Sequence, residues 1–105
     1  MRTKVELEFL KEYPRIEDYN MEGTALLGLF AWPRELDLPL LADGARLRLG
    51  GVAHHVSRVV VEEDGSQMVT CSVTAHDPWS AQREMAELEV EGWERAGIVD
   101  VDTGA

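Results

Sequence analysis

The sequence predicts an α+β fold in which one helix packs on a mostly antiparallel sheet. Several segments alternate apolar and polar residues as strands do, one segment has helical spacing, and Asp-Gly and Gly-Gly pairs mark turns. The predicted strands lie near residues 3–10, 45–49, 52–62, 66–75 and 93–101, and the predicted helix lies near 78–91. A chain of 105 residues is expected to form a single globular domain, 1–105.

The first half of the chain contains the clearest alternation. In 3–10, three apolar residues alternate with charged ones, which predicts a strand with one buried face. Residues 21–32 are apolar but contain two glycines and end before Pro33, which favours a buried strand over a helix. Residues 36–40 alternate around Pro39, which predicts a short edge segment because proline is confined to edges and strand ends.

Residues 52–75 form the strongest predicted hairpin. Asp64-Gly65 suits a two-residue turn, because these residues tolerate the positive φ that such a turn needs. With this turn, Val60 faces Val69 and Arg58 faces Cys71 on the more apolar side of the hairpin, which we expect to meet the core. Arg58 does not fit that side, and a longer turn would change the register.

The predicted helix begins at Asp77-Pro78, with aspartate as N-cap and proline in the first turn. Its apolar residues follow at helical spacing: Ala81, Met85 and Leu88. Gly92 suits a left-handed C-cap. Residues 87–91 also alternate, so a strand competes with the helix over 84–91.

Charge excludes some classes of partner. The chain has 20 acidic residues and 10 lysines and arginines, a net charge of −10. Residues 61–105 alone contain 11 acidic and 2 basic residues. Binding to nucleic acid or to anionic lipid needs clustered positive charge, so we expect neither partner. An acidic surface can instead steer a basic protein towards the chain.

Catalytic motifs are absent from the sequence. It contains no nucleophile elbow and no glycine-rich phosphate loop, and its one cysteine, Cys71, falls in mid-strand and is expected in the core. We therefore expect no enzyme activity and no cofactor. Without a signal-peptide pattern or a long apolar run, the chain is expected to be a soluble cytoplasmic protein.

The candidates for a metal site are His54, His76 and Asp77. In the predicted hairpin register these residues gather at one end of the sheet, and imidazole and carboxylate groups bind zinc or copper. The adjacent His55 would point to the opposite face, so both neighbours cannot ligate one metal without a bulge. Ordinary polar histidines at the strand ends are the simpler interpretation.

The candidates for a protein interface are acidic and aromatic. Glu84, Glu87 and Glu91 would form a charged stripe on the helix, which could dock a basic partner or could simply be its solvated side. Trp32 or Phe30 would provide an apolar anchor if the apolar run 25–32 were exposed.

Two classes of function are consistent with these residues. The first is a non-enzymatic protein-binding module, such as an inhibitor, immunity-type protein, adaptor or assembly component, which docks through an acidic face and could form a homodimer. The alternative is a small-ligand or metal-binding domain at the end of the sheet near His54. The sequence predicts the first.

Overall fold

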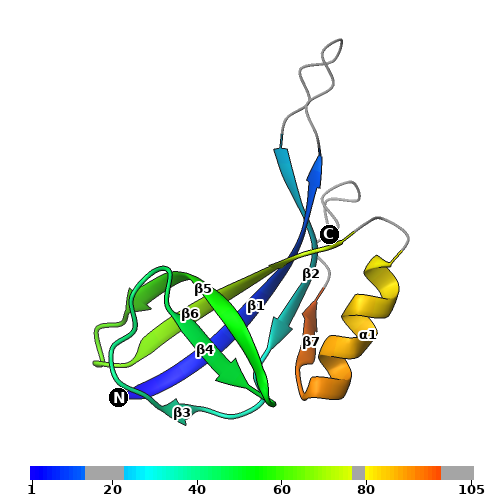
Figure 1. Ribbon diagram of the computed structural model, residues 1–105. Coiled ribbons are helices and arrows are strands. Elements are labelled where there is room, and N and C mark those ends of the chain that lie inside the picture. Colours follow the sequence, from blue (N-terminus) through cyan, green and yellow to red (C-terminus); the bar gives the residue numbers. More distant parts are fainter. Residues whose placement is uncertain (14–22, 77–79, 98–105) are drawn as a thin grey trace.

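The computed structural model describes residues 1–13, 23–76 and 80–97, which form a seven-stranded sheet and one helix (Figure 1). The predicted α+β class and mostly antiparallel sheet are confirmed. In chain order the elements are β1 (Arg2–Tyr13), β2 (Gly23–Ala31), β3 (Leu36–Asp37), β4 (Arg46–Leu49), β5 (Val52–Val61), β6 (Gln67–Thr74), α1 (Ala81–Glu91) and β7 (Glu94–Gly97). The predicted helix start at Asp77-Pro78 and the end of the last strand, 98–101, lie outside the described residues.

The sheet has β1 near its centre, in the order β4-β5-β6-β1-β2-β7, with β3 pairing the start of β1 (Figure 1). Strands β1 and β6 are parallel, and every other pair in this order is antiparallel. The β1–β6 pair brings the start of β1 beside the start of β6, because Thr3 is opposite Gln67. The amino-terminal residues and the β5–β6 turn therefore lie at the same end of the sheet.

The core lies between the inner face of the sheet and α1. Strand β1 contributes its alternating residues, α1 contributes its predicted apolar stripe, and β4 closes the other side. The buried apolar residues are Val5, Leu7, Phe9, Phe30, Leu47, Leu49, Val56, Val69, Cys71, Ala81, Met85, Leu88 and Trp93. Cys71 is in the core as expected, and burial raises the pKa of its thiol to about 11, which keeps it protonated and unreactive.

The β5–β6 hairpin differs from its predicted register. Val61 pairs with Gln67, and the loop has three residues, 63–65, ending at Gly65 with φ 84°. The longer loop shifts the pairing by one residue and removes Arg58 from the core face. A bulge then places Ser57 and Arg58 together opposite Thr70, which returns Val56 to the core face. The predicted pairing of Arg58 with Cys71 is therefore wrong.

The helix ends as the sequence predicts. Gly92 has φ 120°, its backbone N–H donates to the Glu89 carbonyl, and the Trp93 N–H donates to the Leu88 carbonyl, the double hydrogen bond of a Schellman motif. Residues 84–91 are thus helical, and the competing strand is not formed. No helix within the described ranges is long and apolar enough to cross a membrane.

Candidate functional site

The two predicted apolar anchors are mostly inside the protein. Phe30 is 1% exposed and belongs to the core, so the prediction that its side chain anchors a partner does not fit its position. Trp32 is half-buried, and its ring packs edge-on against Trp93 with the ring centroids 5.2 Å apart. The apolar run 25–32 is covered at these positions because Phe30 belongs to the core and Trp32 packs against it.

The three predicted helix glutamates do not form one free stripe. The Glu84 carboxylate accepts hydrogen bonds from the His76 backbone N–H and the Ser80 hydroxyl, so it holds the chain at the start of α1. The Glu91 carboxylate turns towards His54. Only Glu87 stays largely in solvent, at 4.0 Å from Arg83. Two of the three carboxylates therefore hold the fold together.

His54 and Glu91 instead meet beneath the end of α1. The His54 Nε2 lies 3.5 Å from a Glu91 carboxylate oxygen, and the His54 ring packs edge-on against Trp93 at 5.3 Å. His54 is 4% exposed. His76 is exposed and Asp77 lies outside the described residues, and within those residues no three His, Cys, Asp or Glu side chains could hold one metal ion. The observed partner of His54 is a glutamate 37 residues away.

Burial gives His54 a predictable effect on stability. Desolvation lowers the pKa of His54 below its ordinary value of 6.5, and the nearby Glu91 carboxylate opposes part of this shift. The unfolded chain then binds a proton more readily than the folded protein below about pH 6.5. Above that pH, we expect His54 to cause no loss in the free energy of unfolding. The free energy of unfolding should then fall as the pH drops through the lowered pKa of His54.

Chemical denaturation between pH 7.5 and 5 measures this effect. His54→Gln should remove the part of the pH dependence due to His54, whereas His55→Gln, which changes an exposed neighbour, should retain it. Equal pH dependence in the two variants would show that His54 does not carry the effect.

A depression lies at the other end of the sheet. It has a volume of about 570 Å³ and is formed by the start of β1, the β5–β6 turn, the start of β6 and the residue before β3. We call it the hairpin depression. It is lined by Arg2, Lys4, Glu35, Glu62, Glu63, Asp64, Ser66, Gln67 and Met68.

The carboxylates of the hairpin depression have two different roles. Asp64 accepts hydrogen bonds from the Ser66 hydroxyl and backbone N–H, and these bonds hold the pKa of Asp64 below its ordinary range. Its pairing with Arg2 at 2.9 Å adds a smaller effect in the same direction. Glu35, Glu62 and Glu63 are exposed and form no ion pair within the described residues. Asp64 therefore fixes the turn, and the other three carboxylates leave an excess of negative charge at the opening.

Apolar side chains lie directly beside these acids. Val60, Met68 and Lys4 form one row across β5, β6 and β1 on the outer face of the sheet. Val60 is 44% exposed, whereas the side chain of Val61, which pairs with the buried Gln67, lies on the opposite face of the sheet. The site thus combines an acidic rim with an apolar surface, as protein interfaces often do.

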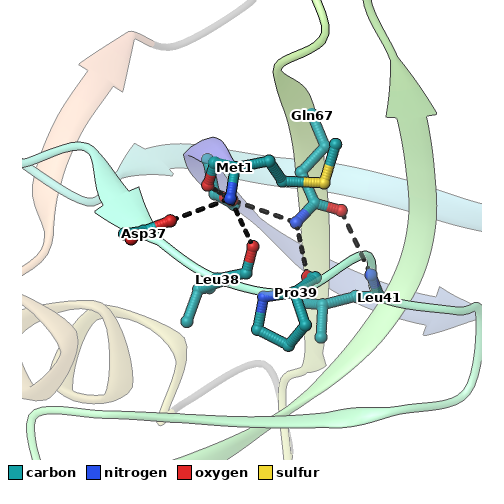
Figure 2. A network of polar contacts seen from close by, with 7 residues as sticks. Met1, Asp37, Leu38, Pro39, Leu41 and Gln67 are labelled. Carbon is teal, nitrogen blue, oxygen red and sulfur yellow. Dashed lines mark hydrogen bonds and ion pairs between the residues drawn. The ribbon is translucent and has the colours of Figure 1, made fainter.

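A buried glutamine holds the wall of the depression in place (Figure 2). The Gln67 side chain is 1% exposed, and its Nε2 donates to the Thr3 hydroxyl at 3.0 Å and to the Pro39 carbonyl at 2.8 Å. Its Oε1 accepts from the Leu41 backbone N–H at 3.1 Å. These bonds tie the segment after β3 to β1 and β6. They fix the position of the chain that follows Glu35.

The sequence did not predict this site. Glu62-Glu63-Asp64-Gly65 is the pattern of an ordinary solvated turn, and nothing local links it to Glu35 or Lys4. The link comes from the parallel pairing of β1 with β6.

No family model, curated protein or solved structure matches the chain. Exposed carboxylates can hold ammonium or guanidinium groups, and neighbouring valine and methionine side chains can contact aliphatic stems. This combination suits recognition of a lysine- or arginine-containing segment.

Proposed function

We propose that the chain is a non-enzymatic protein-binding module that docks a basic segment of a partner protein at the hairpin depression. The observation that carries the proposal is a set of three carboxylates, Glu35, Glu62 and Glu63, that form no ion pair within the described residues and surround a depression of about 570 Å³. The class of function is the one that the composition predicts. The proposed docking surface differs from the predicted stripe of helix glutamates, because two of those three carboxylates contact other parts of the fold.

Charge complementarity supports a basic partner. Two of the three rim glutamates, Glu62 and Glu63, come from residues 61–105, where the excess of acids is greatest, and such a surface accelerates the approach of a positive partner. Val60 and Met68 would exclude water around the ion pairs and slow dissociation. Rigid support from Gln67 and Asp64 reduces the entropy lost when the partner binds.

Affinity capture from host lysate with charge-matched variants tests the proposal. Glu62→Lys/Glu63→Lys reverses the rim, and Glu87→Lys/Glu94→Lys makes the same change in net charge at exposed positions on α1 and β7. Wild type and the second variant should retain a common basic protein that high salt removes. The rim variant should retain about tenfold less of it, because long-range attraction is lost.

Two results would contradict the proposal. Equal retention by both variants would show that the rim is not the docking surface. Loss only in the Glu87/Glu94 variant would place docking at the helix instead. Circular dichroism of each variant checks that the fold is intact.

A further inference from the structure

We propose that Arg46, His55 and Ser72 form a binding site for a small oxyanion, a carboxylate or phosphate group, on the outer face of the sheet. This site is separate from the hairpin depression and does not depend on the docking function. It uses residues of three adjacent strands, β4, β5 and β6.

The three side chains occupy one row across the sheet. Arg46 is directly opposite His55, and His55 is directly opposite Ser72. Side chains paired in this way lie on the same face with Cβ atoms about 4.5–5.5 Å apart, so their polar ends can converge on one small ligand. Together with Ala53, His54 and Val73 they line a depression of about 310 Å³.

Arg46 gives this row a positive charge that no ion pair within the described residues offsets. Four arginines of the described structure are paired with carboxylates: Arg2, Arg58, Arg83 and Arg95. Arg46 is exposed and forms no ion pair or side-chain hydrogen bond within the described residues. Glu8, the next residue of the row beyond Ser72, lies 3.7 Å from the Arg58 guanidinium, which balances its charge.

The chemistry of the row suits an oxyanion. A guanidinium donates two parallel hydrogen bonds to carboxylate or phosphate oxygens, and the imidazole N–H and the serine hydroxyl can donate to the remaining oxygens. A depression of this volume is at the lower end of the range for small-molecule sites. The donors are open to solvent, so we expect millimolar rather than tight binding.

Titration of the ¹⁵N-labelled full chain tests the site, with inorganic phosphate and succinate as separate probes at constant ionic strength. We expect saturable amide shifts centred on residues 46, 55 and 72 for at least one probe. Arg46→Gln should weaken binding by about tenfold or more, because the bidentate donor is lost. Arg48→Gln should leave the affinity within about twofold, because Arg48 lies on the same strand but donates to the Gly51 carbonyl.

The two probes distinguish the sources of the oxyanion. Saturation by phosphate alone assigns a phosphate-bearing ligand, and saturation by succinate alone assigns a carboxylate ligand. Linear, non-saturating shifts with both probes would overturn the proposal. Equal weakening by Arg46→Gln and Arg48→Gln would also overturn it, because the effect would then be one of general charge.

Discussion

Trp93→Ala is expected to lower the free energy of unfolding by about 3–5 kcal/mol, the cost typical of removing a large aromatic side chain from a core. Trp93 is 2% exposed and its ring contacts both Trp32 and His54 edge-on. These contacts join the end of β2, the strand β5 and the turn after α1. The indole N–H finds no acceptor within the described residues, so Trp93→Phe should cost much less, because it removes no hydrogen bond.

Equilibrium denaturation in urea measures the loss, with Val90→Ala as the control. Val90 lies three residues earlier and is 88% exposed, so its truncation should change stability by less than about 0.5 kcal/mol. If Trp93→Ala proved as mild as Val90→Ala, Trp93 would not be the residue that closes the core at this end.

Gln67→Leu is expected to cost about 2–3 kcal/mol even though it replaces a polar side chain in the core by an apolar one of similar size. The substitution removes all three hydrogen bonds of the Gln67 side chain, which leaves the Pro39 carbonyl and the Leu41 N–H without these partners (Figure 2). Because those bonds hold the segment after β3, we expect this segment to open locally in the variant more readily than the whole protein unfolds.

Amide hydrogen exchange separates the local effect from the global one. In Gln67→Leu, exchange at Leu41 should accelerate more than exchange at Val69, which lies in the core strand β6. Leu40→Ala serves as the control, because Leu40 is 64% exposed in the same segment and should leave both rates nearly unchanged. A uniform acceleration at Leu41 and Val69 would contradict a local role for Gln67.

Local patterns were sufficient for most elements of the fold. The alternation in β1, the apolar spacing in α1 and Gly92 at its end depend on residues close together in the sequence, and the structure confirms them. The hairpin was placed correctly but its register was not. The observed register, with its three-residue loop and the bulge at Ser57, differs from the predicted one by only a small free energy. That difference depends on which residues meet the core.

The candidate sites depend on pairings that no local pattern contains. The parallel β1–β6 pair brings Lys4 beside Met68, and the tertiary fold brings His54 on β5 to Glu91 at the end of α1. Phe30 looked like a surface anchor because its segment is short and apolar, yet its side chain packs in the core. Composition predicted an acidic docking surface, and only the tertiary contacts showed which acids are free.

Site-specific photo-crosslinking in host cells tests the docking surface most directly. A photoreactive phenylalanine derivative replaces Val60, which is opposite Met68 of the hairpin depression, in one variant and Val90 on α1 in another, both of which are exposed positions. A docking surface at the hairpin predicts a crosslink from position 60 to a basic protein, and a much weaker one from position 90. A crosslink to such a protein from position 90 alone, or none from position 60, would contradict it.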